Sequence, residues 1–145
     1  WNRDEANKES IIDGWFYSGD AGYFDEDGFL FIYDRVKDMI ISGGENIYPA
    51  EVENALMHHP DVIDAAAVGV PDDKWGETVK GFVVLKKDSK VRESDIIAAT
   101  KNLIASYKCP SSINFISEMP RNPSGKILRR ELRAPFWEDG KRNVS

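Results

Sequence analysis

The chain has 145 residues, of which 41% are apolar and 30% charged, a composition typical of a globular protein with room for one real core. Lysine and arginine total 19 against 25 acidic residues, and the formal charge of −6 argues against a general nucleic-acid binder, which relies on many basic contacts to phosphates. No apolar run approaches the ~20 residues that a membrane-spanning helix needs, and no signal peptide is visible.

The first third of the sequence predicts an exposed polar segment followed by two hairpins. Residues 1–14 are mostly polar or charged, which favours an exposed position. Apolar runs on both sides of the Asp-Gly turn at residues 27–28 are typical of a β-hairpin, and the Gly-Gly turn at residues 43–44 indicates a second, shorter one. The expected strands are residues 23–24 with 29–33, and residues 39–41 with 45–48.

From residue 49 onward the predicted order is helix, strand, strand, helix, strand and short helix. Pro49 suits the first helical position because its missing N–H has no partner there, and Val52, Ala55 and Leu56 then recur at helical spacing. We therefore expect an α+β fold with a small three-stranded sheet flanked by helices, plus the second hairpin. The expected bounds are residues 49–59, 65–70, 81–85, 94–107, 113–116 and 127–133, with a frayed tail at 139–145.

Cys109 is the single cysteine of the sequence, so neither an intrachain disulfide nor a cysteine cluster for zinc can form. No histidine is close to it in sequence, which favours a small, partly buried thiol over a catalytic nucleophile. This cysteine usage fits a reducing compartment, and we expect a cytoplasmic protein whose full-length form can still associate peripherally with a membrane. Because the first residue is Trp1 and not Met, we expect the chain to be a piece of a longer one.

Lys126 follows a segment whose composition predicts a stiff turn. Pro120 and Pro123 restrict the backbone, and Ser124-Gly125 permits a tight reversal before an amphipathic run begins at residue 127. Such a turn can hold an ammonium group out towards an anion. Taken alone, the pattern is more often that of a solvated surface lysine.

Four segments together carry a resemblance to a known family. They are Tyr17-Ser18-Gly19-Asp20, the Asp-Arg-Val-Lys-Asp run at 34–38, the Ser-Gly-Gly-Glu-Asn-Ile-Tyr-Pro-Ala-Glu-Val-Glu run at 42–53, and the turn at 120–126. In this order and spacing the chain resembles the C-terminal part of the acyl- and aryl-CoA synthetases. These enzymes belong to the adenylate-forming superfamily, with luciferases and the adenylation domains of peptide synthetases. The third segment is most similar to fatty-acyl and related CoA ligases.

The resemblance implies a two-step enzyme. A carboxylic acid and ATP, with Mg²⁺, give an acyl-adenylate, and the acyl group then passes to the thiol of coenzyme A. A small C-terminal domain rotates between the two steps and presents a different face to each. Residues 1–36 would be the end of the large AMP-binding domain, and residues 37–145 would be the small domain.

The same resemblance implies that this chain is incomplete as an enzyme. The phosphate loop, the acyl and adenine pockets and the glutamate that holds magnesium belong to the large domain, which is the expected partner of this one. We expect no metal site and no bound cofactor in the chain itself, and no activity from it alone. No pattern in the sequence selects the acid or the oligomeric state.

The resemblance also assigns roles to charged residues. Lys126 matches the lysine that bridges the attacking carboxylate and the α-phosphate during adenylation. Asp20 matches the carboxylate that binds the ribose hydroxyls, and Arg35 matches an arginine at the ribose or phosphate side of the nucleotide. The alternative for Arg35 is a surface ion pair with Asp34 or Asp38.

Two further positions follow from the match. Lys37 falls at the hinge, where the backbone changes between the two domain orientations. Gly43 and Gly44 match the hairpin that enters the active site for the thioester step, where a missing Cβ lets the backbone approach the pantetheine arm; they also suit an ordinary hairpin turn. The family resemblance further implies control by a lysine acetyltransferase and deacetylase, because acetylation of Lys126 would remove its charge.

Other interpretations stay open at this point. The chain could belong to an adenylation domain that loads a carrier-protein phosphopantetheine, to a luciferase-like oxidative enzyme, or to a non-catalytic binding module that docks on a separate large domain. Residues 75–77 (Trp-Gly-Glu) are interpreted as structural. Glu51 and Glu53 are expected to cap or solvate their helix.

Overall fold

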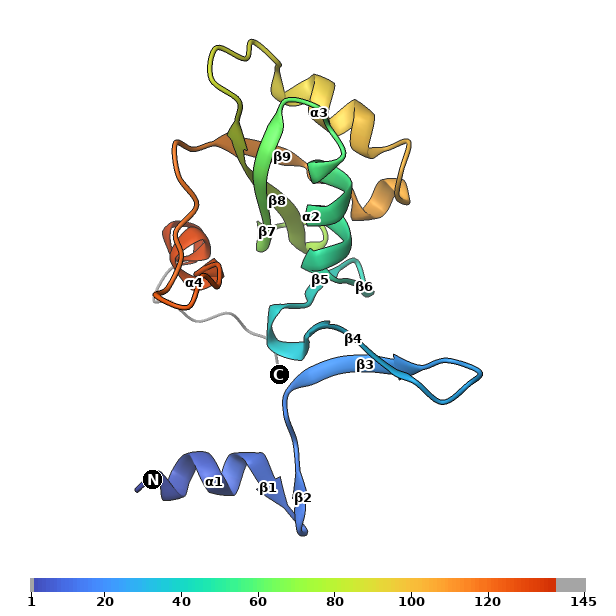
Figure 1. Ribbon diagram of the computed structural model, residues 1–145, viewed down its shortest axis with the longest axis vertical. Coiled ribbons are helices and arrows are strands. Elements are labelled where there is room, and N and C mark those ends of the chain that lie inside the picture. The colour runs from blue at the N-terminus through green and yellow to red at the C-terminus, as the bar shows by residue number, and fades with distance from the viewer. Residues whose placement is uncertain (1, 138–145) are drawn as a thin grey trace. The chain divides into compact units, whose positions relative to one another are not determined.

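The computed structural model describes residues 2–137, and the chain divides into two compact units between Lys37 and Asp38 (Figure 1). None of the helices among the described residues is long and apolar enough to cross a membrane. The tail predicted at residues 139–145 lies outside the described part.

The first unit is built from a short helix and two hairpins. The predicted hairpin around residues 25–28 is confirmed, and its turn is closed by the Asp25 carboxylate, which accepts the N–H groups of Asp27 at 3.1 Å and Phe29 at 2.8 Å. The exposed segment at residues 1–14 contains a helix that the sequence did not predict. The elements are α1 (Asp4–Ser10), β1 (Ile11–Ile12), β2 (Trp15–Phe16), β3 (Asp20–Phe24), β4 (Leu30–Arg35) and a 3₁₀ helix (Val36–Asp38).

The second unit is an α+β domain, as predicted. The order of its elements from residue 49 also agrees with the prediction. Its strands are β5 (Ile40–Ser42), β6 (Glu45–Ile47), β7 (Val62–Asp72), β8 (Gly76–Leu85) and β9 (Ser112–Phe115), and its helices are α2 (Pro49–Met57), α3 (Glu93–Thr100) and α4 (Arg129–Arg133).

Strand β8 organises the sheet of this unit. It pairs antiparallel with β7 along one side and parallel with β9 on the other, which gives the three expected strands. The hairpin β5–β6 joins the same sheet where Ser42 pairs with Gly76, so the complete sheet has five strands. The glycine-rich turn of the hairpin is therefore attached directly to the start of β8.

Helices cover both faces of the sheet, with α2 and α3 on one side and α4 on the other (Figure 1). The first face packs side chains such as Val52, Leu56 and Ile96 against the sheet, all with no exposed surface. On the second face, Met119 and Leu132 pack against alternate β7 residues, namely Ala66, Val68 and Val70. This alternation is the period of two that a strand buried on both faces requires.

The second predicted helix is shorter than expected. It ends at Thr100 and not near residue 107, and a 3₁₀ helix follows at Ser106–Lys108. The Thr100 hydroxyl donates back to the Ile96 carbonyl at 2.9 Å, an interaction that competes with helix continuation. Leu103 and Tyr107, which the sequence placed on the apolar stripe, lie beyond the end of this helix and are about half exposed.

Candidate functional site

Lys126 ends a turn whose shape is set by the side chain of Asn122. The Asn122 Oδ1 atom accepts the N–H groups of Ser124 at 3.1 Å and Lys126 at 2.8 Å, and the Ser124 hydroxyl at 2.8 Å. The Asn122 N–H donates to the Lys126 carbonyl at 2.9 Å, which closes the loop. Gly125 has φ +82°, a left-handed conformation that favours glycine. The stiff turn that the prolines predicted is thus present, with Lys126 exposed at its end.

The helix after this turn is fixed by an ion pair. Arg129 donates to both carboxylate oxygens of Glu53, at 3.0 and 2.7 Å, and lies 3.8 Å from a carboxylate oxygen of Asp38. Two largely buried side chains joined in this bidentate way form a strong, directional contact. The segment carrying Lys126 is therefore tied to α2.

Glu51 and Glu53 do not cap or solvate their helix, so that prediction was wrong. Glu51 binds Lys108 with both oxygens at 2.8 Å, and Glu53 accepts the Ala67 N–H at 2.9 Å in addition to Arg129. Their partners are distant in sequence, which is why a local pattern did not reveal them.

Asp20 and Arg35 face each other as a cross-strand pair of β3 and β4. The Arg35 Nε lies 2.7 Å from Asp20 Oδ1, so the structure joins the two residues assigned to the nucleotide. The Asp34 carboxylate accepts the Arg35 backbone N–H at 2.7 Å, and a carboxylate oxygen of Asp38 lies 3.8 Å from Arg129.

Lys37 lies inside the 3₁₀ helix at Val36–Asp38, and the boundary between the two compact units falls directly after it. Its side chain is exposed. The hinge assignment itself stays a prediction.

Gly43 and Gly44 form the tip of the β5–β6 hairpin, with φ values of +59° and +87°. The Gly43 N–H donates to the Trp75 carbonyl at 2.9 Å. A Cβ at Gly43 would lie 2.7 Å from the indole ring of Trp75, whereas a Cβ at Gly44 would meet no atom within 4 Å. The Trp75 ring thus leaves no room for a side chain at residue 43, whereas a side chain at residue 44 would face open space.

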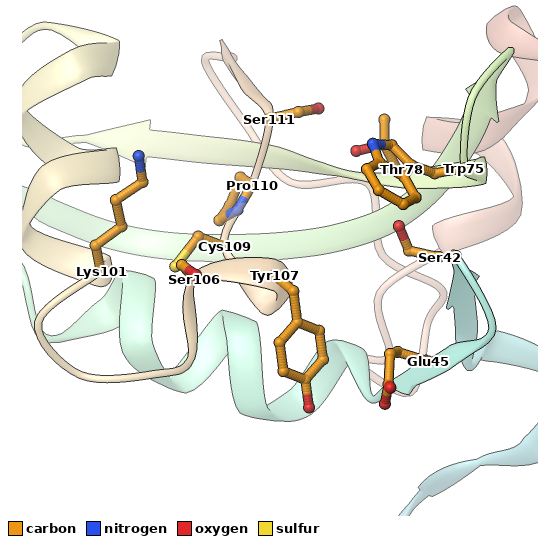
Figure 2. A pocket seen from close by; sticks show the side chains of 11 residues that line it. Ser42, Glu45, Trp75, Thr78, Lys101, Ser106, Tyr107, Cys109, Pro110 and Ser111 are labelled. Atoms are coloured by element: carbon orange, nitrogen blue, oxygen red, sulfur yellow. The ribbon is translucent and has the colours of Figure 1, made fainter.

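A pocket of about 380 Å³ opens beside this hairpin (Figure 2). Figure 2 shows Ser42, Glu45 and Trp75 gathered on one side and Lys101 with Cys109 on the other. Lys126 does not line it, so the turn and the pocket are separate sites. The lining residues are Ser42, Gly43, Glu45, Trp75, Thr78, Lys101, Ser106, Tyr107, Cys109, Pro110 and Ser111.

Sequence reasoning missed this pocket and two of its residues. Trp75 was interpreted as structural, and its contact with Gly43 agrees with this, but its ring also lines the pocket. Lys101 was not singled out, because it lies in a stretch that the sequence assigned to a longer helix. The adjacent glycines Gly43 and Gly44 were the sequence feature that could have indicated the pocket, because residues without a Cβ atom leave space beside the backbone.

Cys109 is 8% exposed, in keeping with the expected buried thiol. Its Sγ lies 3.5 Å from the Ala105 carbonyl oxygen. Burial raises the pKa of the Cys109 thiol above its ordinary value, and the Lys101 cation offsets this only in part. The thiol therefore stays protonated at neutral pH, which suits a pocket wall better than a nucleophile.

Among residues 2–137 no group of three or more histidine, cysteine, aspartate or glutamate side chains could hold a metal ion.

Comparison with known proteins decides the family. The profile described as AMP-binding enzyme C-terminal domain matches residues 51–126, which is more than half of the chain. The chain belongs to this family. The matched region runs from α2 to Lys126 and includes most of the pocket.

Two curated relatives illustrate the likeness. Fatty acid–[acyl-carrier-protein] ligase ScoC of Streptomyces coeruleorubidus is 50% identical over 145 residues, covering 100% of this chain and 28% of the relative. A 2-succinylbenzoate–CoA ligase of Bacillus cereus (strain Q1) is 50% identical over 133 residues, covering 92% of this chain and 27% of the relative. The chain thus spans only about a quarter of the length of these relatives.

Solved structures agree in fold. ATP-bound MatB from Rhodopseudomonas palustris has a TM-score of 0.87 at 34% identity, covering 97% of this chain and 28% of that one. The o-succinylbenzoate CoA synthetase MenE of Bacillus subtilis, in complex with its acyl-adenylate intermediate, has a TM-score of 0.84 at 44% identity, covering 90% and 27%. The Mycobacterium tuberculosis fatty acyl CoA synthetase has a TM-score of 0.72 at 46% identity, covering 94% and 27%.

The different surroundings of the two hairpin glycines predict different stability losses for their alanine variants. Gly43→Ala and Gly44→Ala both place a side chain at positive φ, which costs on the order of 1 kcal/mol in each variant. Only the methyl group at residue 43 also overlaps the Trp75 ring, which adds about 1–3 kcal/mol. Urea unfolding should therefore show a clearly larger loss of stability for Gly43→Ala. Equal losses would contradict the close packing of Trp75 on the hairpin.

Proposed function

We propose that this chain is the C-terminal part of an ATP-dependent acid–thiol ligase, which forms an acyl-adenylate and then an acyl thioester of coenzyme A. The observation that carries the proposal is the rigid, exposed turn that presents Lys126. An ammonium group held in this way can stabilise the negative charge that develops between a carboxylate and the α-phosphate. Membership of the AMP-binding enzyme C-terminal domain family supports this role.

The two-site arrangement supports two half-reactions. Lys126 and the pocket beside Gly43 lie at different places on the second unit, and neither depends on the other for its shape. We propose that Lys126 serves adenylation and that the pocket receives part of coenzyme A during thioester formation. The Lys101 cation on its wall suits a phosphate-bearing ligand.

The nucleotide contacts and the hinge complete the proposal. Asp20, oriented by Arg35 at 2.7 Å, would accept the ribose hydroxyls of ATP. The division of the chain directly after Lys37 supports a hinge at this residue. Magnesium would be bound by a part of the enzyme outside the described residues.

The first unit supports a large-domain partner. None of its described residues is buried, and Trp15, Phe16 and Phe24 expose 74%, 71% and 70% of their surface. Two short hairpins cannot bury such side chains by themselves. We propose that residues 1–36 are the end of the large AMP-binding domain, whose remaining chain covers these aromatic rings.

For the acid, we propose a fatty or related carboxylic acid. The relatives described as a fatty acid ligase and a fatty acyl CoA synthetase support this class. The 2-succinylbenzoate–CoA ligases match equally well, because the acid pocket is expected outside this region.

A second candidate is a ligase that loads the phosphopantetheine of a carrier protein. The 50% identity to a ligase described as acting on an acyl carrier protein favours it, since that match covers the whole chain. Supplying the full-length enzyme in parallel with coenzyme A and with a carrier protein whose phosphopantetheine thiol is free distinguishes the two acceptors.

The Lys126→Ala variant of the full-length enzyme tests the main proposal. We expect acid-dependent pyrophosphate exchange to fall by about 10²–10³-fold, because a charge-stabilising donor is lost. Thioester formation from supplied acyl-adenylate should be unchanged. Lys87→Ala, which removes another exposed lysine, is the control and should leave both steps intact. Equal loss of both half-reactions in Lys126→Ala would refute the assigned role.

The Gly44→Trp variant should show the opposite pattern. The open space beside Gly44 admits a large side chain, which would then obstruct the approach of the pantetheine arm. We expect the thioester step to be blocked while pyrophosphate exchange continues, and Gly44→Ala to retain both. If exchange is lost first, the hairpin does not border the thiol path.

We also propose that acetylation of Lys126 regulates the enzyme. The exposed position of Lys126 makes it accessible to a modifying enzyme, and an acetyl group would remove the charge used in adenylation. Mass spectrometry of protein isolated from cells in several growth conditions should detect acetyl-Lys126. Its complete absence from all of them would contradict this regulation.

A further inference from the structure

We propose that Arg121 is a positioning residue for adenylation, because its guanidinium group ties the turn that carries Lys126 to strand β7. The inference rests on the proposed role of Lys126 and adds a residue to it. Arg121 does not need to touch a substrate. It acts on the backbone that determines where the ammonium group of Lys126 can reach.

The contacts of Arg121 reach two separate elements. Its Nη1 donates to the Gly125 carbonyl at 2.7 Å, and its Nη2 donates to the two carboxylate oxygens of Asp64 at 2.9 and 2.7 Å. The Gly125 carbonyl belongs to the peptide bond that leads into Lys126. One planar, rigid group therefore connects the sheet to the peptide unit of Lys126.

Asp64 is available for this contact because of its place in the alternation of β7. The pairing with β8 shifts register between Val62 and Asp64, with Ile63 as the extra residue. Val62 packs on the face covered by α2, whereas Ala66 packs on the face covered by α4. Asp64 lies two residues before Ala66 on the regular side of the bulge and so shares its face, whereas the extra residue Ile63 leaves Val62 on the opposite face. Asp64 therefore points towards the segment that carries Lys126.

The tip of the turn has no comparable attachment among the described residues. Residues 122–126 hydrogen-bond to one another through Asn122, which makes the tip a closed unit. Arg121 provides the hydrogen bond that links this unit to the sheet, while Met119 and Ile127 pack beside it on the second face. Removing Arg121 would leave the tip intact but free to tilt.

A positioning role and a purely structural role differ in their consequences. The side chains of Arg121 and Asp64 are 41% and 28% exposed, and an ion pair so accessible to water contributes little to stability. A structural role thus predicts small, equal effects on both half-reactions. Misplacing a reacting group by about 1 Å can slow a reaction by roughly 10²-fold, so positioning predicts a selective effect on adenylation.

The test uses Arg121→Ala and Asp64→Ala in the full-length enzyme. Each variant should slow acid-dependent pyrophosphate exchange by about 10- to 100-fold through kcat and leave thioester formation from supplied acyl-adenylate unchanged. The retained half-reaction shows that the variant is folded. Arg92→Ala is a matched control, because Arg92 makes a similar fork to Asp95 at 3.0 and 2.9 Å without any contact to the turn. It should leave exchange unchanged.

A lysine variant and a hydrogen–deuterium exchange measurement test the positioning role of Arg121 further. Arg121→Lys keeps the charge but not the fork, and should not restore exchange; full rescue by lysine, or equal slowing of both steps in Arg121→Ala, would overturn the proposal. Hydrogen–deuterium exchange should be faster in the peptide covering residues 120–128 of Arg121→Ala, and unchanged exchange there would also overturn it. If Lys126→Ala itself leaves pyrophosphate exchange intact, the proposed function fails, which is a distinguishable result.

Discussion

The position of the C-terminal segment depends on the open edge of strand β7. β7 pairs with β8 on one side only, so the backbone groups on its other side need partners. The Glu53 carboxylate accepts the Ala67 N–H at 2.9 Å, and the Trp137 indole N–H donates to the Gly69 carbonyl at 3.1 Å. Glu53 also binds Arg129. The same carboxylate therefore provides a partner for the edge of β7 and anchors the segment that follows Lys126.

The second unit thus carries two rigid loops, and each loop is held in place by different contacts. The turn before Lys126 is closed by Asn122 and tied to β7 through Arg121 and Asp64, whereas the Gly43-Gly44 hairpin rests on the start of β8 and the ring of Trp75. Each loop uses glycine at positive φ to make a tight reversal. Two rigid loops on one small domain suit an enzyme that presents different groups to two successive steps.

Much of the fold could be predicted because its signals are local. The Asp-Gly turn, Pro49 at the start of α2 and the helical spacing of Val52 and Leu56 all act within a few residues, and the order of elements followed from them. The turn before Lys126 was predictable for the same reason, since prolines and glycine set its backbone. Asn122 was overlooked, although asparagine two residues before a serine commonly closes such a turn.

The rest depends on contacts that no local pattern encodes. The basic partners of Glu51, Glu53 and Asp64 come from segments 57 to 76 residues away, and their pairing exists only once the sheet has formed. The bulge at Ile63, which places Val62 and Asp64 on opposite faces, leaves no mark in the strand sequence. The end of α3 at Thr100 was missed because apolar residues continue at helical spacing beyond it.

A crystal structure of the full-length enzyme with a bound acyl-adenylate would test the central claim most directly. The measured quantity is the distance from Lys126 Nζ to the carbonyl and phosphate oxygens of the ligand. We predict about 2.7–3.2 Å to at least one of them, with the turn still held by Arg121 and Asp64. An adenylation-state structure in which Lys126 points away from the ligand, and another cation occupies that position, would contradict the account.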